Sequence, residues 1–403
     1  MAGKTRYIGF AFLAALLALS SCGDPDLQPV YYALSQEIPL GDDKGFPDEA
    51  SAFRMVKFND GAYDCYLAAA GRLYIRGVLL LPPPAPPDRW TVVAPPAGLD
   101  NAMCNTLEIF NDGLGDDIYA GFYNSSSGAG YGLWTSPLSS SPVWTEVADL
   151  AVRDKGIALL KTVGSDLFVS THVKTSTTST YALYFLNGAL FTLVDWAVDP
   201  PAEIGFLDVA RATSGGSYWI LVGGSLYRSA IIGGVFDVYA GGANSPVSPL
   251  SGPPVSGGLF DDTIALYVAA GNGHLYRTAN GGTTWTRTNI TDPVPDDDGD
   301  PVHFTSFAAP LADSSPAGNV YIGTQGQGYY RIEGGAVDGA LGTVILRQPA
   351  YNITALYNGS LNFLFYDAGA SPPMTSRLFL GTNGSGLWRG DYASGSTWTW
   401  KQE

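Results

Sequence analysis

The sequence predicts an all-β protein, a seven-bladed β-propeller of four-stranded antiparallel blades. Three observations support this prediction: a strand block that recurs along the chain, a turn sequence that occurs twice, and a composition poor in charged residues. The block is a short apolar strand ending in small residues, then a Gly-Leu-Tyr-Arg-like segment, then a Trp-Thr strand. β-rich units repeated every 46 to 58 residues are typical of propellers and similar arrays. The seven copies begin at Tyr66, Ile118, Leu167, Ile220, Leu266, Val320 and Leu378.

The repeat also places the four strands of each unit. The turn sequence Phe-Asn-Asp-Gly occurs at residues 58–61 and again at 110–113, and Asp-Gly favours the tight turns of β-hairpins. We therefore expect the innermost strand just before this turn, as at Phe53–Phe58 and Thr106–Phe110. The recurring block then supplies the second and third strands. The outermost strands are predicted at 90–93, 144–147, 285–288 and 398–401, with weaker versions near Phe236 and Thr343.

Closing the units into a ring removes the unpaired edges that a linear stack would leave open. A short apolar stretch, Val30–Leu34, is a candidate strand that could join the last blade and latch the ring. The alternative is an eight-bladed ring whose degenerate first unit is built from residues 23–50.

Composition agrees with an exported β protein. Charged residues make up 14 % of the chain, against about 25 % in an average soluble protein. Amphipathic helices with charged outer faces are therefore not expected. The net charge is -16, and loss of residues 1–21, which hold Lys4 and Arg6, would make it -18. Such an acidic chain is repelled by nucleic acid and by anionic head groups, so neither is a predicted partner.

The first 22 residues predict an export signal. Lys4 and Arg6 precede an apolar stretch, Ile8–Leu19, that is too short to span a bilayer. The sequence Leu-Ser-Ser-Cys at 19–22 then resembles a bacterial lipobox. That resemblance implies a lipoprotein signal peptide at 1–21 and a lipid on Cys22. The alternative is an ordinary secretory signal whose cysteine is incidental. The Pro/Asp/Gln-rich residues 22–48 are interpreted as a tether, and the repeat map places the propeller at 49–403.

The predicted location of the protein is the bacterial cell envelope. Two or three acyl chains anchor a protein stably, because each buried methylene contributes about 0.8 kcal/mol. Contact with the membrane is expected to come from the lipid on Cys22. The next residue is Gly23 rather than the Asp linked to inner-membrane retention in some bacteria. The lipobox resemblance therefore implies the outer membrane or the cell surface rather than the inner membrane.

One turn carries a family resemblance. Residues 278–285, Thr-Ala-Asn-Gly-Gly-Thr-Thr-Trp, resemble the Asp-box (BNR) pattern Ser-x-Asp-x-Gly-x-Thr-Trp, with Thr for Ser and Asn for Asp. Residues 395–398 match half of it. In that family the motif lies between the third and fourth strands of a blade. The resemblance implies the propeller fold shared by sialidases, xyloglucan-type endoglucanases, sortilin-type receptors and photosystem assembly factors. It implies no activity.

The resemblance also allows the sialidase activity to be tested against the residues. Sialidases of this fold use three converging arginines, a Tyr nucleophile with a Glu partner, and an Asp acid. The Arg-Ile-Pro signature near the first blade is missing here. Four arginines do share one repeat position on predicted third strands, which lie toward the rim. We therefore interpret them as structural rather than as a carboxylate clamp: Arg228, Arg277, Arg331 and Arg389.

A second enzymatic possibility is an inverting glycosidase, which needs two carboxylates about 6.5–9.5 Å apart. Glu108 and Asp208 fall on predicted innermost strands and could face the channel. We expect them to be solvated carboxylates near the channel mouth, and we predict no catalytic residue. Tyr123 and Tyr131 flank a Ser/Gly loop, where they could stack on a sugar or a peptide; the alternative is a mobile loop.

No metal site and no cofactor are predicted. The histidines, His172, His274 and His303, have no second His or Cys at ligand spacing. The acidic loop Asp296–Asp300 begins like a calcium loop but lacks the Glu at its twelfth position. We interpret it as a solvated loop, with calcium binding as the alternative.

Two cysteines besides Cys22 invite a disulfide in an exported protein. The repeat map places Cys65 and Cys104 about a strand length apart, roughly 17–20 Å. A disulfide needs Cα atoms within about 7 Å. The map therefore argues against a bridge, although a small shift of the strand boundaries would reopen it.

These features predict a lipid-anchored propeller outside the cytoplasm that has no catalytic role. Propellers present loops around a rigid ring, which favours a protein-binding or scaffolding platform with an envelope protein as its partner. The alternative is a propeller that binds glycans or a diverged, sialidase-like glycosidase. A purely structural surface antigen is a third possibility.

Overall fold

The computed structural model describes residues 45–403, apart from short gaps. The gaps are 48, 62, 80–88, 176, 188–189, 213–215, 224, 242–257, 262–264, 270–272, 288–298, 301, 309–319, 327, 333–344, 349–359, 368–375 and 394–396. Cys22, the tether up to residue 44 and the Val30–Leu34 strand lie outside the described residues, as does most of the Asp296–Asp300 loop. No helix in the described part is long and apolar enough to cross a membrane.

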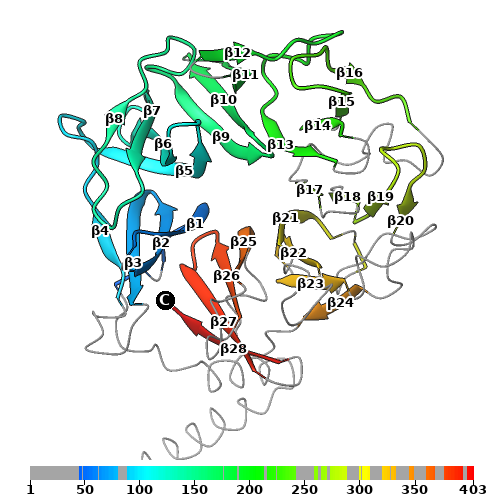
Figure 1. Cartoon of the computed structure of the whole chain (residues 1–403). Helices are drawn as coiled ribbons and strands as arrows, with labels where there is room; N and C mark the ends of the chain where they lie inside the picture. Colours follow the sequence, from blue (N-terminus) through cyan, green and yellow to red (C-terminus); the bar gives the residue numbers. More distant parts are fainter. Residues whose placement is uncertain are drawn as a thin grey trace, which may run out of the picture.

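Seven four-stranded antiparallel sheets form a ring, and each sheet is one continuous stretch of chain (Figure 1). The strands of blades 1 to 4 are β1 (Arg54–Asn59), β2 (Tyr63–Ala70), β3 (Arg72–Leu79), β4 (Thr91–Val93); β5 (Ala102–Asn111), β6 (Asp116–Asn124), β7 (Gly130–Pro137), β8 (Thr145–Glu146); β9 (Gly156–Val163), β10 (Asp166–Lys174), β11 (Ser179–Asn187), β12 (Leu190–Leu193); β13 (Phe206–Arg211), β14 (Tyr218–Val222), β15 (Ser225–Ser229), β16 (Asp237–Val238). Those of blades 5 to 7 are β17 (Gly258–Asp261), β18 (Leu266–Ala269), β19 (Leu275–Thr278), β20 (Thr286–Arg287); β21 (Phe304–Ala308), β22 (Val320–Thr324), β23 (Tyr329–Ile332), β24 (Ile345–Gln348); β25 (Leu361–Asp367), β26 (Arg377–Thr382), β27 (Leu387–Ala393), β28 (Thr397–Gln402).

The predicted seven-bladed propeller is therefore confirmed, and the described residues form no eighth blade. Each copy of the recurring block lies on the second strand of its blade. These strands are almost continuously apolar because both of their faces are covered; β14, β18 and β22 are buried along their whole length. The described core divides into seven clusters, one at each interface between neighbouring blades.

The repeated Phe-Asn-Asp-Gly turns form as predicted, and the asparagine explains why. The Asn59 side chain accepts a hydrogen bond from the Gly61 N–H at 2.7 Å and donates to Asp64 at 3.1 Å. Asn111 makes the same two bonds, at 2.9 Å from the N–H of Gly113 and 2.8 Å to Asp116. The glycine of each turn has a positive φ, 92° and 94°, which a residue with a Cβ adopts at a cost.

The turn at 278–285 joins the third and fourth strands of blade 5, as the resemblance implied. The Thr278 hydroxyl accepts a hydrogen bond from the Gly282 N–H at 2.9 Å, and Asn280 accepts one from the Thr284 N–H at 2.9 Å. The Trp285 ring is buried against Trp219, with centroids 5.9 Å apart. The motif thus fastens a turn and one aromatic anchor of the interface between blades 4 and 5.

Five innermost strands contain a β-bulge that the repeat did not predict. In β5, β9, β13, β21 and β25 one residue is passed over in the pairing with the second strand. A bulge re-aims side chains and is common beside functional sites. Four of the extra residues line the central channel: Asn105, Ala158, Thr305 and Asn362.

The cysteines confirm the repeat map. Cys65 and Cys104 are buried free thiols. Cys104 pairs with Gly71, which lies six residues beyond Cys65 in the sequence. Six residues of extended chain span about 20 Å, so the two thiols lie too far apart to form a bridge.

Both thiols are expected to be inert in the folded protein. Burial raises the pKa of Cys65 and that of Cys104 to about 12, and only the thiolate reacts. A thiol reagent at pH 8 should modify neither until denaturant is added. Two thiols should then appear if Cys22 is acylated, and three if it is not. Rapid labelling without denaturant would show that this part of the core opens.

Candidate functional site

The central channel forms a cavity with a volume of about 1090 Å³. Its wall contains side chains from the innermost strand of every blade, because these strands surround the axis of the ring (Figure 1). The bulges turn polar groups such as Asn105 and Asn362 toward it. A large concave cavity with a few polar groups is the usual place for a ligand, and we treat it as the candidate site.

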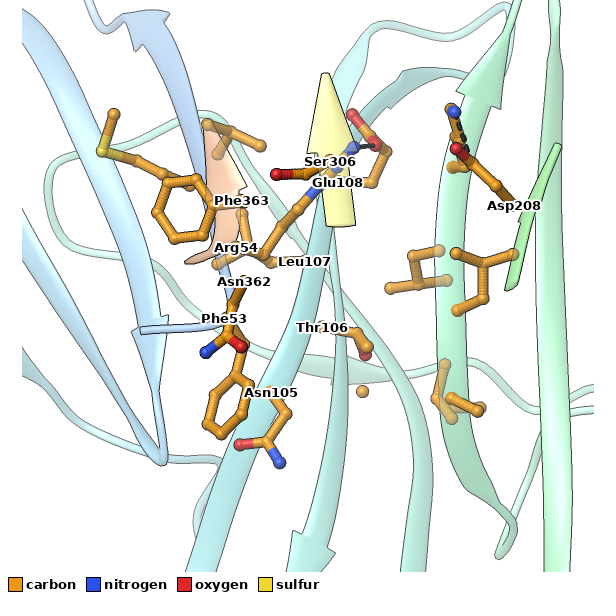
Figure 2. A pocket seen from close by; sticks show the side chains of 18 of the residues that line it. Phe53, Arg54, Asn105, Thr106, Leu107, Glu108, Asp208, Ser306, Asn362 and Phe363 are labelled. Carbon is orange, nitrogen blue, oxygen red and sulfur yellow. Dashed lines mark hydrogen bonds and ion pairs between the residues drawn. The ribbon is translucent and has the colours of Figure 1, made fainter. Parts of the chain in front are cut away.

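Glu108 and Asp208 both lie on the channel wall, as predicted, but neither is a solvated carboxylate. Figure 2 shows Arg54 extending toward Glu108, and the two groups are 2.6 Å apart. Lys161 forms the same kind of ion pair with Asp208. The Glu108 side chain is 13 % exposed and that of Asp208 is 16 %. The expectation of solvated carboxylates is therefore wrong: the curvature of the ring places a cation from a neighbouring blade against each.

These pairs connect neighbouring blades. Arg54 and Glu108 link blades 1 and 2. Asp208 of blade 4 holds Lys161 of blade 3 and accepts the N–H of Leu259 of blade 5 at 2.7 Å.

A buried tyrosine–carboxylate contact lies where blade 7 meets blade 1. Tyr66 donates a hydrogen bond to Asp367, and Arg377 donates to the Tyr66 oxygen at 3.0 Å. Lys57 contacts Asp367 at 2.8 Å. Burial, followed by the charge of Asp367, raises the pKa of Tyr66. These contacts join blade 7 to blade 1.

The repeated arginines lie on third strands, as predicted, and each faces an aromatic residue of the second strand. Arg277 pairs with Tyr267 and donates to its hydroxyl at 3.2 Å; Arg228 lies over the ring of Trp219, 5.3 Å from its centre. Such contacts stabilise a buried guanidinium. Arg76 of blade 1 also lies opposite an aromatic residue of the second strand, Tyr66, but on the other face of its sheet, toward blade 7. The position equivalent to the four arginines is Ile75, which pairs with Leu67.

The Ser/Gly loop between β6 and β7 contains several hydrogen bonds. Asn124 accepts the N–H groups of Ser126 and Ser127 at 2.9 Å each and donates to the Tyr131 hydroxyl at 2.7 Å. Tyr131 donates in turn to the carbonyl of Asp100. Tyr131 is therefore a support of the loop, whereas Tyr123 lines the channel.

A second cavity, of about 460 Å³, opens beside this loop between blades 2 and 3. It shares Gly128, His172 and Lys174 with the channel wall, so the two cavities adjoin. Among the described residues that line the two cavities, His172 is the only histidine. No three His, Cys, Asp or Glu side chains gather as metal ligands in the described part of the chain.

No family model matches the chain, and no curated protein in the comparison is similar to it. Solved structures share its fold. YCF48 bound to D1 peptide is 11 % identical, with a TM-score of 0.52 over 90 % of this chain and 100 % of that one. The extracellular domain of a putative one component system from B. thetaiotaomicron is 13 % identical, with a TM-score of 0.50 over 88 % of this chain.

The chain spans only 40 % of that second protein. PorZ, a surface component of the type-IX secretion system of Porphyromonas gingivalis, is 14 % identical, with a TM-score of 0.48 over 89 % of this chain and 38 % of that one. At identities this low the likenesses concern the fold alone. They place this chain with the β-propellers.

Proposed function

We propose that this protein is a lipid-anchored propeller of the bacterial cell envelope that binds a protein partner and has no catalytic role. The observation that supports this most is the pairing of the channel carboxylates. Glu108 and Asp208 are engaged by Arg54 and Lys161, which makes them ties between blades. The ring is thereby stiffened while its mouth stays open, and a stiff ring with open loops suits recognition.

The comparisons lend support of a general kind. The YCF48 propeller is described in complex with a peptide, so a ring of this fold can receive a segment of another protein. The lipobox-like Leu-Ser-Ser-Cys sequence at 19–22 supports export and attachment through Cys22. In this proposal the partner is an envelope protein met at the membrane surface.

Crosslinking in intact cells tests the proposal. The acylated protein would be crosslinked, purified through a tag, and its bound proteins identified by mass spectrometry. We expect repeated capture of one envelope complex. Capture should fall when the loop face that carries Ser127 and Lys174 is substituted, and it should persist when the opposite-face turn at Asn59–Gly61 is substituted. Well-expressed protein that repeatedly captures nothing would overturn the proposal.

A glycan-active propeller is the second candidate, favoured by the open channel with Phe53 and Tyr123 in its wall. Its test is hydrolysis of a panel of sialosides and neutral oligosaccharides. Turnover that disappears in both Glu108→Gln and Asp208→Asn would establish a glycosidase and would exclude the non-catalytic assignment. Binding of a glycan without turnover would support a lectin-like protein instead.

A further inference from the structure

Two neighbouring hairpins have longer second strands than the blades that follow them, within the part of the chain that the structure describes. Beyond the recurring block, β6 continues for three residues to Asn124 and β10 continues for four to Lys174, whereas β14 and β18 end with the block or before it. Each extra residue adds about 3.3 Å. The hairpins β6–β7 and β10–β11 therefore rise roughly 10–13 Å over the channel mouth, side by side on blades 2 and 3 (Figure 1).

The 460 Å³ cavity lies between these hairpins, and we call it the hairpin cleft. Ser127–Gly130 form one wall, His172–Thr175 form the other, and Asp154 and Gly156 complete it. The first wall is already ordered in the free protein by Asn124, which binds two loop N–H groups. A preformed wall lowers the entropic cost of binding a ligand.

His172 is held in one orientation within the cleft. It pairs with Gly156 across the sheet, and a Cβ at position 156 would lie 2.1 Å from the imidazole. The glycine thus makes room for the ring. Nδ1 is buried and has no hydrogen-bond partner, so the tautomer that carries its proton on Nε2 costs least. Burial and then Lys174 lower the pKa of His172, which keeps it a neutral Nε2–H donor.

Lys174 contributes a positive charge at the channel mouth of an acidic chain, and the one carboxylate in the described cleft lining, Asp154, lies 3.4 Å from Arg153. The channel wall holds four cations, Arg54, Lys57, Lys161 and Lys174, and two carboxylates, Glu108 and Asp208, in a protein of net charge -16. The first three cations are ion-paired. Lys174 is exposed and makes no ion pair with any described residue. A cation in a concave surface attracts and orients anionic ligands.

We propose that the hairpin cleft binds an acidic peptide segment of the partner. A carboxylate of the peptide would accept hydrogen bonds from Lys174 Nζ and His172 Nε2–H. An adjacent apolar side chain would enter the channel mouth beside Phe53 and Tyr123. The walls of the cleft favour peptide over sugar, since their glycines leave backbone groups accessible and the described lining contains no aromatic ring other than the imidazole. This inference rests on the proposed protein-binding function.

The test begins with a phage-displayed library of random dodecapeptides, selected on the purified full chain. We expect enrichment of Asp and Glu beside an apolar residue. A fluorescent copy of the selected peptide should bind about tenfold more weakly to Lys174→Glu, because reversal replaces attraction by repulsion. The loss should shrink in 1 M salt. His172→Ala should also weaken binding.

Arg72→Glu is the matched control, since Arg72 is an exposed cation on the same face of blade 1, outside both cavity walls. It should bind like the parent chain, and all three variants should unfold at the parent's denaturant midpoint. Selected peptides without acidic residues, or equal binding by Lys174→Glu, would overturn the inference. Binding of oligogalacturonate but of no peptide would assign the cleft to an acidic glycan. If crosslinking captures a partner that Lys174→Glu still binds, the proposed protein-binding function stands, but the inference that the hairpin cleft binds that partner is wrong.

Discussion

Replacing Glu403 with alanine is expected to destabilise the protein by about 3–5 kcal/mol, the usual effect of breaking a buried ion pair. The Glu403 side chain is fully buried, pairs with Arg76, and lies 2.9 Å from Arg389. It also accepts the indole N–H of Trp90 at 3.1 Å. Arg76 and Trp90 belong to blade 1 and Arg389 to blade 7, so one carboxylate joins the two ends of the ring.

The size of the effect follows from the two guanidiniums. Burial lowers the pKa of Arg389, and Glu403 opposes that shift. Without the carboxylate both arginines remain charged in a region that water does not reach. Urea unfolding followed by tryptophan fluorescence would measure the loss. Glu203→Ala removes an exposed carboxylate and should change the free energy of unfolding by less than about 0.5 kcal/mol.

Two further variants separate charge from packing. Glu403→Gln keeps the shape and part of the hydrogen bonding, so it should lose less than alanine but more than the exposed control. Replacing Arg76, Arg389 and Glu403 together by leucine removes all three charges and should recover much of the loss. A change below about 1 kcal/mol for Glu403→Ala would mean that the ring closes through other contacts.

Replacing Cys22 with alanine is expected to move nearly all of the protein from the membrane fraction to the soluble fraction. The lipobox resemblance implies two or three acyl chains on this residue, and each buried methylene contributes about 0.8 kcal/mol. The acidic chain supplies no basic patch that would hold it to anionic lipid. Metabolic labelling with an alkyne fatty acid, followed by fractionation, measures both the lipid and its consequence.

Cys65→Ala is the matched control, because it removes a buried thiol elsewhere in the chain. It should keep the fatty-acid label and the membrane location. An unlabelled parent protein would identify the leader as an ordinary secretory signal. Membrane attachment that survives in Cys22→Ala would require an anchor elsewhere.

Much of the fold was predictable from local sequence patterns. Seven copies of one apolar block predicted seven blades, because a second strand covered on both faces must be apolar along its length. The Asn-Asp-Gly turns were predictable because their key interaction is local: the Asn59 side chain accepts a hydrogen bond from the backbone N–H of Gly61, two residues later. The third-strand arginines were recognisable in four blades from their fixed offset. Arg76 does not share that offset, and its role at the junction of blades 7 and 1 was not predicted.

The candidate site was predictable only in part. Glu108 and Asp208 were assigned to the channel because they fall on predicted innermost strands of the repeat. Their pairing with Arg54 and Lys161 depends on which strands become neighbours around the ring. The hairpin cleft depends on how far β6 and β10 extend and on the bulges. The repeat map could not predict these features, because it gives only the position of each repeat.

The contacts that close the ring show most clearly what the sequence alone does not predict. The sequence by itself determined the number of blades, the order of their strands and their tight turns, because these follow from short-range patterns of apolar, aromatic and turn residues. Only the tertiary structure decided that Glu403 meets Arg76 across 327 positions, that Tyr66 meets Asp367, and that Lys174 and His172 face a cleft. Those contacts join distant segments through the curvature of the ring, and that curvature arises from the packing of all seven blades together.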